Sequence, residues 1–405
     1  MSNSDQVAAL AENSRPPIPA LAYLLTGCIA VIGSNSLVLG PIAPAVASSF
    51  GTSVPAVMMA AAAFGLGTSA SALFLARYID RIGARRMLQA ALLTLAAGLV
   101  ASAAAPTVIA LVAAQLLAGI AAGVAMPAIY ASAAAIAPPG RESGTIGVVL
   151  TGWTLSMVAG VSLSAVLADL VHWRAVFAAV AVFAALAWAG LTMTSLSDVR
   201  KAGPAPAPLE ALSIPGIIPL LVACGAFMTA FYGAYGYLGD HLHVGLGEPV
   251  SANGLAALAY GLGFGTAALL DGVIDRLGAG RVMPFAYLLV AIVYVAIAGA
   301  SNSYGLTLAM VAAWGLANHF GLNVLVMRLS ALDPSRRGTI MGLNSAVTYL
   351  AVFVGTTGFG PLYSSFGFAT CAMVAALLML VAASAAAWRT RQPDPSHRIA
   401  PVDRS

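Results

Sequence analysis

Long apolar runs dominate the chain and are separated by short segments of charged or turn-forming residues. A membrane-spanning helix needs about 20 mainly apolar residues, and twelve runs reach about this length. Short alternating strands of the β-barrel kind do not accompany them, so helices must satisfy the backbone hydrogen bonds in lipid. The pattern therefore predicts an all-α integral membrane protein with twelve transmembrane helices, near residues 19–40, 54–76, 86–104, 107–136, 144–168, 175–196, 214–238, 252–272, 281–300, 304–330, 339–363 and 366–388.

The amino-acid composition supports the same interpretation. Of the 405 residues, 60% are hydrophobic and only 8% are charged, whereas soluble domains carry about 25% charged residues. This excludes soluble enzymes, nucleic-acid binders and disordered scaffolds, and the net charge of +4 is attributed to loops that face an anionic lipid surface. The cysteines, Cys28, Cys224 and Cys371, lie inside apolar runs, so we expect neither disulfides nor a zinc site, and no cofactor.

The basic residues fall almost entirely on one side of the predicted helices. If the N-terminus is cytoplasmic, seventeen of the 18 Lys and Arg residues lie on the cytoplasmic side, and Arg174 alone lies on the other. An odd number of spans would scramble this segregation. The positive-inside rule therefore predicts that both termini are cytoplasmic.

One long polar connection divides the chain. Residues 197–213 read SDVRKAGPAPAPLEALS, and their alternating Pro and Ala favour extended, semi-rigid chain over helix. We therefore expect an N-terminal six-helix half at 1–196, a cytoplasmic linker at 197–213 and a C-terminal six-helix half at 214–405.

The two halves repeat each other in sequence. The segment IDRIGA at Ile79–Ala84 returns as IDRLGA at Ile274–Ala279, which is 195 residues later. Two shorter strings also recur, namely GTI from Gly144 and Gly338, and GLG from Gly65 and Gly261. An alternating-access carrier requires such a repeat, with its substrate held between the halves near the membrane midplane.

In these motifs the sequence resembles the major facilitator superfamily, and within it the twelve-span drug:proton antiporters that include bacterial sugar-efflux and purine-efflux-like proteins. The family's loop between spans 2 and 3 reads Gly-x-Leu-x-Asp-Arg-x-Gly-Arg-Arg. Here Ala76–Arg86 keeps the Asp-Arg-x-Gly core and the trailing arginines, but not the leading Gly and the Leu. A second family feature, Trp-Arg-x-x-Phe, is present at Trp173–Phe177. The resemblance covers nearly the whole chain and implies the major facilitator fold, with two pseudo-symmetric six-helix halves in a bacterial inner membrane.

The loop after span 2 is a candidate gate. In the family, the aspartate that matches Asp80 engages the start of span 11 and helps to hold the halves together on the cytoplasmic side. A carboxylate is favoured at a helix N-terminus, and Gly83 permits a tight turn. We assign this gating loop to Asp80, Arg81, Gly83, Arg85 and Arg86. The alternative is a basic loop that only sets the topology.

Positions at which antiporter relatives carry coupling residues are altered in this chain. Span 1 contains Ser34-Asn35-Ser36, where an acid is frequent in the relatives. In span 4, Gln115 replaces the family's arginine four residues before a glycine, and the proline and glycine repeat of span 5 is reduced to Gly160–Ser164. All fourteen Asp and Glu residues lie in tails, in loops or at span ends.

His319 is the one titratable residue predicted in mid-span. It shares a helical face with Gly315 and Asn323, and an imidazole exchanges a proton near neutral pH. We expect a proton carrier here, with Asn323 on its face and Asn35 and Gln115 as polar neighbours across the cavity. The alternative is a neutral histidine that donates to a backbone carbonyl and serves packing.

Spans 7 and 4 supply candidate substrate contacts, because the resemblance places spans 1, 4, 7 and 10 around a central cavity. Methionine and aromatic side chains make adaptable apolar surfaces, and span 7 carries Met228, Phe231, Tyr232, Tyr235 and Tyr237. We expect Tyr232 to face the cavity and Tyr237 to belong to an aromatic belt at the outer interface. In span 4 the spacing of Gly119 and Gly123 indicates close helix packing, so only Gln115 is assigned to the substrate.

Together these features predict a secondary transporter and not an enzyme. It is expected to act as a monomer in lipid and to export a small amphiphilic solute (drug, sugar or metabolite) in exchange for protons. An uncoupled facilitator or an importer of similar fold is the alternative, followed by a polytopic membrane enzyme or sensor. The sequence shows no HExxH motif, paired intramembrane acids or Ser/His/Asp set to support catalysis, and no P-loop to indicate a pump. A nucleic-acid partner is not expected.

Overall fold

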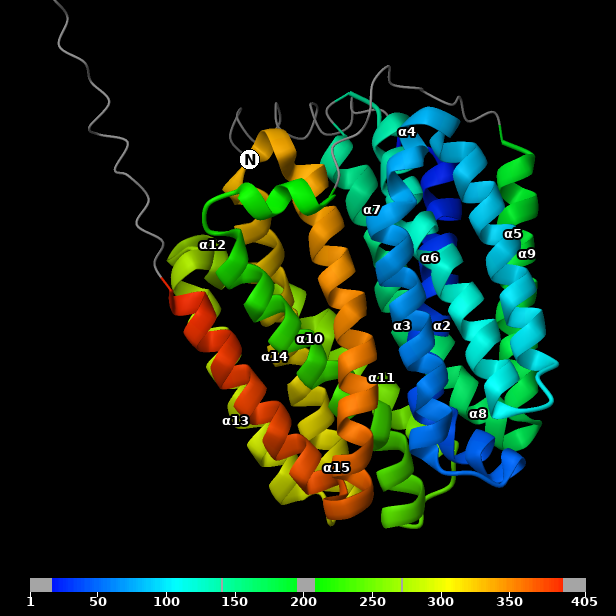
Figure 1. The fold of residues 1–405 in the computed structure, drawn as a ribbon. Coiled ribbons are helices and arrows are strands. Elements are labelled where there is room, and N and C mark those ends of the chain that lie inside the picture. Colours follow the sequence, from blue (N-terminus) through cyan, green and yellow to red (C-terminus); the bar gives the residue numbers. More distant parts are fainter. Residues whose placement is uncertain (1–16, 140, 195–207, 271, 389–405) are drawn as a thin grey trace, which may run out of the picture.

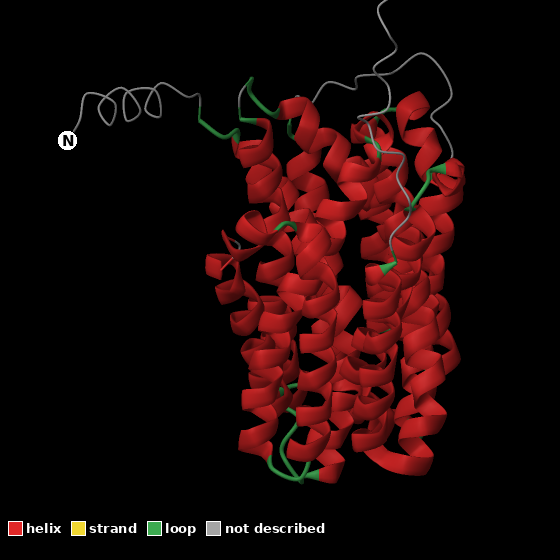
Figure 2. Cartoon of the chain, turned by 90° about the vertical axis from the view of Figure 1, so that its left-hand side faces the viewer, coloured by secondary structure: helices red, strands yellow, loops and turns green. Residues whose placement is uncertain are grey.

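The computed structural model describes residues 17–139, 141–194, 208–270 and 272–388, without the side chains of residues 80, 142, 143, 273 and 275. All regular elements in these ranges are helices, which stand side by side in one bundle (Figure 1). Figure 2 shows the same bundle from the side, with helices joined by short loops. The prediction of an all-α fold is confirmed.

The first half contains six membrane-crossing helical segments. They are α2 (Ala20–Phe50), α3 (Val54–Phe74), α5 (Ala84–Ala103), α6 (Val108–Ile136), α7 (Glu142–Leu155) continued by the π-helix η2 (Ser156–Val161) and α8 (Ser162–Leu170), and α9 (Trp173–Thr192). The sequence predicts an end of the first span near residue 40, but α2 continues to Phe50 through Pro41 and Pro44. Each proline removes one helical N–H, and the burial of this stretch among other helices keeps it helical.

The second half repeats this order. Its segments are α10 (Ile217–Asp240) continued by the π-helix η4 (His241–Gly245), α11 (Ala252–Ala267), α13 (Ala279–Ala300), α14 (Tyr304–Leu332) and α15 (Arg337–Ala387). Short helices fill the same connection in both halves, with η1 (Ala76–Tyr78) and α4 (Ile79–Ile82) in the first, and η5 (Ala268–Leu270) and α12 (Gly272–Leu277) in the second.

Helix α15 makes two crossings. A straight helix of 51 residues would measure about 76 Å, more than twice the ~30 Å hydrocarbon core. Gly367 interrupts it with φ 77° and ψ −178°, a conformation that glycine adopts readily. Figure 1 shows the orange part running down beside α3 and the red part returning upward. Within the described ranges, eleven helices are long and apolar enough to cross a membrane, and the turn in the last of them gives the predicted twelve crossings.

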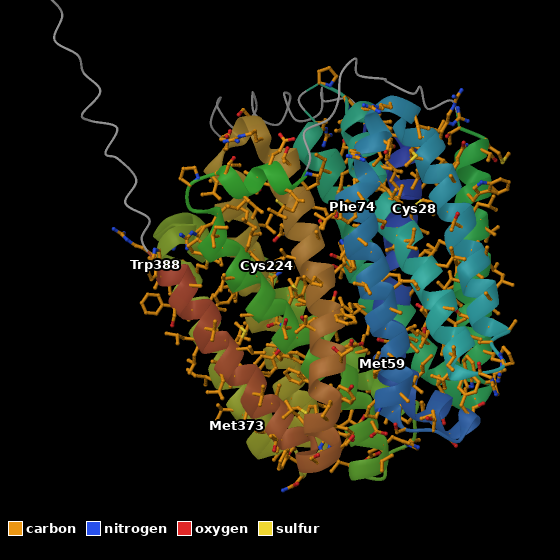
Figure 3. All side chains as sticks on the ribbon, viewed as in Figure 1. Cys28, Met59, Phe74, Cys224, Met373 and Trp388 are labelled. Atoms are coloured by element: carbon orange, nitrogen blue, oxygen red, sulfur yellow. The ribbon has the colours of Figure 1, made fainter. Side chains whose placement is uncertain are left out.

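The outer surface of the bundle is apolar. Large hydrophobic side chains point outward from it, as Met59, Phe74, Met373 and Trp388 do in Figure 3. The three cysteines are buried as free thiols. Such an apolar outer surface is suited to contact with the lipid chains of a membrane, in agreement with the prediction that the protein lies in lipid.

The two ends of the bundle differ in charge. We call the end at which α2 begins and α15 ends the terminal face, and the opposite end the distal face. At the distal face Arg174 donates to the Ala105 carbonyl at 2.9 Å, and its guanidinium lies 4.3 Å from the centre of the Trp173 ring. The other described arginines belong to loops or helix ends at the terminal face, namely Arg77, Arg81, Arg85, Arg86, Arg141, Arg276, Arg281, Arg328, Arg336 and Arg337. The described residues therefore have the charge segregation that the sequence predicts.

Two helix crossings carry the internal repeat into three dimensions. In the first half α3 packs on α6, and in the second half α11 packs on α14. A Cβ added to Gly119 would collide with the Phe64 carbonyl, and one added to Gly315 would collide with the Tyr260 carbonyl. Both the glycines and the carbonyls are related by 196 residues in the chain. Gly67 and Gly263 are also 196 residues apart, and each lies against the backbone of its partner helix.

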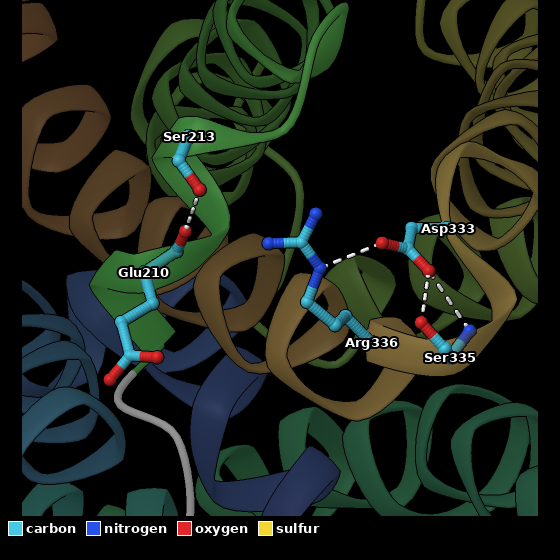
Figure 4. A network of polar contacts seen from close by, with 5 residues as sticks. All are labelled: Glu210, Ser213, Asp333, Ser335 and Arg336. Atoms are coloured by element: carbon cyan, nitrogen blue, oxygen red, sulfur yellow. Dashed lines mark hydrogen bonds and ion pairs between the residues drawn. The ribbon is translucent and has the colours of Figure 1, made fainter.

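Much of the predicted linker lies outside the described residues, and its described end is helical. The sequence favours extended chain there, but Pro208–Ser213 form a short 3₁₀-helix, η3, which packs on α15. Proline suits the first turn of a helix because that turn needs no N–H from it, and the Ser213 hydroxyl donates to the Glu210 carbonyl at 2.8 Å (Figure 4). The expectation of an extended chain is wrong for these six residues.

Candidate transport site and gates

Asn35 and Gln115 form a buried amide pair inside the first half. Asn35 Nδ2 donates to Gln115 Oε1 at 3.0 Å, and Gln115 Nε2 donates back to Asn35 Oδ1 at 3.2 Å. Gln115 Nε2 also lies 3.1 Å from the hydroxyl of Ser102, so the network joins α2, α6 and α5. A neutral amide pair thus occupies the two positions at which the family resemblance implies charged residues.

The two halves meet at the centre through α2 and α10. The Tyr232 hydroxyl on α10 lies close to Ser36 on α2, outside the geometry of a hydrogen bond. One turn further along α10, Tyr235 packs closely on Gly40 of α2. The hydroxyls of Ser36 and Tyr235 are buried and make no hydrogen bond. Buried polar groups without partners are rare, so the centre offers unused hydrogen-bonding groups from both halves.

An aromatic cluster lies behind this contact in the second half. The Phe231 ring stacks on Tyr235 at 5.5 Å and lies 5.5 Å from Tyr260 and 5.4 Å from Trp314. Tyr260 accepts a hydrogen bond from Asn318 Nδ2 at 2.9 Å. Tyr232 was selected from the sequence in this region, whereas Tyr260 and Asn318 were not. These two residues lie on different helices, α11 and α14, 58 residues apart in the chain, and only packing brings them to the Phe231 ring.

His319 and Asn323 lie half-buried on α14. The His319 ring makes an edge-to-face contact with Phe264 of α11 at 5.0 Å and another with Phe320 at 6.0 Å. Asn35 and Gln115 are bonded to each other in the opposite half. The structure therefore brings Asn35 and Gln115 together, but it places His319 between α11 and α14 and does not group it with that pair.

The predicted gating loop adopts a tight turn between α4 and α5. Gly83 has φ 106°, which requires glycine, and its N–H donates to the Ile79 carbonyl at 2.8 Å. Gly278, its counterpart in the second half, has φ 83° and donates in the same way to Ile274. Arg81 and Arg86 are exposed, and Arg85 donates to the Thr192 carbonyl at the end of α9 at 3.2 Å. The side chain of Asp80 lies outside the described part, so its predicted contact with the start of span 11 stays a prediction.

In the part of the chain that the structure describes, one side chain from each half donates a hydrogen bond to the backbone of the other half. Ser69 on α3 donates to the Ala346 carbonyl on α15 at 2.8 Å. Asn253 on α11 donates through Nδ2 to the Pro41 carbonyl on α2 at 2.7 Å. The first bond lies toward the terminal face and the second toward the distal face, as the positions along the helices show. Neither residue was selected from the sequence, because a single Ser or Asn in an apolar run carries no distinctive pattern.

Asp240 is a buried carboxylate at the distal end of α10. It is 8% exposed and accepts a hydrogen bond from the Tyr363 hydroxyl at 2.7 Å. The neighbouring Tyr237 is fully buried and donates to the Thr356 carbonyl at 2.6 Å. The expectation that Tyr237 belongs to an interfacial belt is therefore wrong, because α10 faces α15 at this point. Asp240 was not selected from the sequence, although an acid close to tyrosines at a span end is a pattern that could have marked it as a candidate.

Comparisons with known proteins agree with this geometry. A model of the Major Facilitator Superfamily matches residues 24–356 and 218–404. The chain is 26% identical over 379 residues to the "Uncharacterized MFS-type transporter YwfA" of Bacillus subtilis, covering 89% of this chain and 90% of the relative. It is also 26% identical over 255 residues to the "Probable sugar efflux transporter" of Mannheimia succiniciproducens, covering 60% and 62% of the two chains. The solved structure of a D-xylose-proton symporter superposes with a TM-score of 0.70 at 16% identity, covering 89% of this chain and 96% of that one.

Proposed function

The chain belongs to the major facilitator superfamily and is a membrane transporter, and from that premise we propose that it exports a small, uncharged amphiphilic solute in exchange for protons. The observation that carries the proposal is the central contact of α2 and α10, where unused hydroxyl groups from both halves lie beside an aromatic cluster. Alternating access exposes such a centre to each side of the membrane in turn.

The chemistry of the centre favours an uncharged solute. The groups around it are the hydroxyls of Ser36, Tyr232 and Tyr235, the Asn35–Gln115 amides and the rings around Phe231. Among the described residues, Asp240 is the one buried charged side chain, and it lies at the distal end of α10. Aromatic surface with a few hydrogen-bonding groups is typical of sites for small amphiphilic molecules. The name of the Mannheimia relative, a sugar efflux transporter, is consistent with such a solute.

His319 is the proposed proton carrier. An imidazole changes its charge within the physiological pH range, and ionisable residues inside a membrane protein are functional candidates because their burial is costly. Its position between α11 and α14, with Asn323 one turn away, lets a charge on the ring act on the packing of these two helices. The solved structure of similar fold is that of a D-xylose-proton symporter, which is consistent with proton coupling in this fold.

For orientation we propose that the terminal face is cytoplasmic in a bacterial inner membrane. This follows from the positive-inside rule and from the arginines at that face. A reporter fused after Ser405 should then be active in the cytoplasm. Activity of that reporter only in the periplasm would overturn the orientation.

Asp80 is the proposed cytoplasmic gate residue. Helix α15 begins at Arg337, follows Arg336 and has no acidic residue in its first turn, so the positive end of its dipole is not neutralised there by its own sequence. A carboxylate from the loop after α3 would serve this purpose in one conformation only. The variant Asp80→Asn should bind substrate but transport it much more slowly, whereas wild-type turnover would mean that the loop only sets the topology.

The test of export and coupling uses proteoliposomes with a trapped pH-sensitive dye. A panel of neutral amphiphiles, including sugars and aromatic antibiotics, is added one compound at a time, and uptake and proton flux are recorded together. The proposal expects at least one compound whose flux moves protons in the opposite direction. If the substrate flux does not change when a pH difference is imposed, the uncoupled facilitator is favoured instead.

The variant His319→Gln tests the carrier. Glutamine preserves hydrogen bonding but does not titrate near neutral pH. The variant should lose accumulation against a gradient and keep downhill exchange. If it responds to the pH difference as the wild type does, coupling stands but His319 is a packing residue.

A further inference from the structure

The two hydrogen bonds between the halves stand at opposite faces of the bundle, and each belongs to a different interface. Ser69 joins α3 to α15 toward the terminal face, and Asn253 joins α11 to α2 toward the distal face. Both side chains are buried, at 5% and 2% exposure. A carrier that opens one face at a time must break the bonds at that face while it keeps those at the other.

The terminal-face bond stands in a tight interface. One turn along α3 from Ser69, a Cβ added to Gly65 would lie 2.7 Å from the Tyr349 carbonyl and 2.6 Å from Val352 Cβ. In the repeat, the position 196 residues after Ser69 is Gly265, which has no side chain to donate. A Cβ there would have its nearest neighbour, Thr154 Cγ2 of α7, at 3.9 Å. The related interface between α11 and α7 therefore lacks a bond of this kind at this position.

The distal-face bond uses a weakened stretch of α2. Pro44 has no N–H for the carbonyl of Gly40, and a Cβ added to Gly239 of α10 would lie 2.6 Å from that same oxygen. The next carbonyl, of Pro41, receives Asn253 Nδ2. The position 196 residues before Asn253 is Val57, which has no donor. The carbonyls of Gly40 and Pro41 thus face the other half, where α2 lies against α10 and α11 near the distal face.

We propose that Asn253 and Ser69 are opposing gate latches, Asn253 holding the distal face closed and Ser69 holding the terminal face closed. With both bonds made, the described conformation is closed at both faces. Loss of either bond shifts the population toward the conformation that is open at that face, and loss of both increases the two open conformations at the expense of the closed one. The inference deepens the alternating access of the proposed function, but it depends neither on the substrate nor on proton coupling.

The experiment measures distances between spin labels in the full-length protein in lipid nanodiscs, without substrate or pH gradient. Labels on Thr52→Cys and Val244→Cys report the distal face, and labels on Met193→Cys and Leu269→Cys report the terminal face. Each pair joins the two halves, and all four positions are exposed. The native cysteines are buried, and the unsubstituted parent gives the background labelling.

Asn253→Leu removes the donor at similar volume and should add a population with a longer distal-face distance. Ser69→Ala should add a longer terminal-face distance, and the double variant should add longer distances at both faces, because the closed conformation then loses both bonds while each open conformation loses only one. Thr26→Val is the matched control, because Thr26 donates to the Val148 carbonyl at 3.0 Å within one half, and its loss should shift neither pair. If Asn253→Leu does not fold, Asn253→Ala takes its place.

Opposite shifts in the distances support the latches, whether or not the melting temperature falls. A purely structural role would lower the melting temperature without favouring one face, and that result would overturn the proposal. Unchanged distances in both folded variants would overturn the proposal. The proposal would also be overturned if both variants lengthened the distance at the same face. Because these readings need no transported compound, failure of the latches is distinguishable from failure of the proposed export.

Discussion

The crossing of α3 with α6 and the crossing of α11 with α14 share one backbone geometry, which we call the shared frame, but they differ one helical turn away from the shared glycine contact. Glycines let the backbones touch at Gly119 in one crossing and at Gly315 in the other. One turn further along, the first crossing has Gly123, where a Cβ would collide with Ser71 and with the Thr68 carbonyl, while the second has His319 against the Phe264 ring. The repeat thus preserves the packing geometry, and the second half places its titratable ring where the first half has a glycine in close contact with α3.

The same comparison holds at the centres of the two halves. The buried pair Asn35 and Gln115 is polar, whereas the positions 196 residues later are Phe231 and Val311, both buried and apolar. The centres of the two halves therefore differ in chemistry, with hydrogen bonding in the first and aromatic and aliphatic surface in the second. The experiments below test the shared frame first and the differences afterwards.

Gly119→Ala and Gly315→Ala should give the largest effects, and they should be similar. Each new Cβ would collide with a carbonyl of the partner helix, and overpacking of this kind costs about 1–3 kcal/mol. Thermal unfolding in detergent should show a clear loss in both variants. Gly299→Ala is the control, because nothing lies within 4 Å of a Cβ there. If only one of the two variants is destabilised, the crossings do not share a frame.

Gln115→Leu should come next. It leaves the buried amide of Asn35 without its partner, which costs about 1–3 kcal/mol when a buried polar group is left unsatisfied. The double variant Asn35→Leu with Gln115→Leu should recover part of this loss, because no polar group is then left unsatisfied. Melting temperatures of the single and double variants check this, and a double variant that is weaker than Gln115→Leu would contradict it.

Gly123→Ala and His319→Ala should separate the two crossings. The first adds a methyl group where the helices touch and lowers the melting temperature. The second removes one aromatic edge contact, worth about 0.5–1.5 kcal/mol, and should have the smaller effect on stability. Equal losses in both variants would mean that the His319 level is packed as tightly as the Gly123 level.

Asp333→Asn should have the smallest effect on the melting temperature. It tests whether the turn before span 11 is stabilised by contacts that the turn before span 5 lacks. Asp333 accepts from Ser335 and pairs with Arg336 at 2.7 Å (Figure 4), whereas its counterpart 195 residues earlier is Pro138. Hydrogen bonds from Ser335 and Arg336 lower the pKa of Asp333 from 3.8 to about 2. A depressed pKa contributes stability above pH 4 that disappears as the pH falls through about 2. The small difference in melting temperature between wild type and variant should stay constant from pH 7 to 5 and vanish near pH 2, and a difference that grows with acid would contradict this.

The sequence was sufficient for the fold because lipid leaves few options. The twelve runs and the charge segregation follow from the requirement that each span be apolar and internally hydrogen-bonded. The GLG strings at Gly65 and Gly261 indicated the internal repeat, but the helix crossings that their glycines make are known only from the structure. The end of α2 was misplaced because neighbouring helices keep Pro41 and Pro44 in a helix, which local preference does not predict.

The site was predicted less well, since it depends on which helix faces which. Asn35 and Gln115 were selected from the sequence, but their bond to each other was not foreseen. Asn253 and Ser69 acquire a role only through carbonyls more than 200 residues away in the chain. An acid beside tyrosines at a span end could have drawn attention to Asp240, but its burial depends on the approach of α15, which local sequence does not predict.

The unequal lengths of the helices have a consequence for the surrounding bilayer. Helices α5 and α9 have 20 residues each and measure about 30 Å, which matches the hydrocarbon thickness. Helix α2, with 31 residues, measures about 46 Å and must tilt, bend or protrude. It is also the more deeply enclosed, since most of its surface is covered by other helices. The helix with the greatest hydrophobic mismatch therefore has the least contact with lipid, so its tilt can change during transport without the bilayer having to thin or thicken around it.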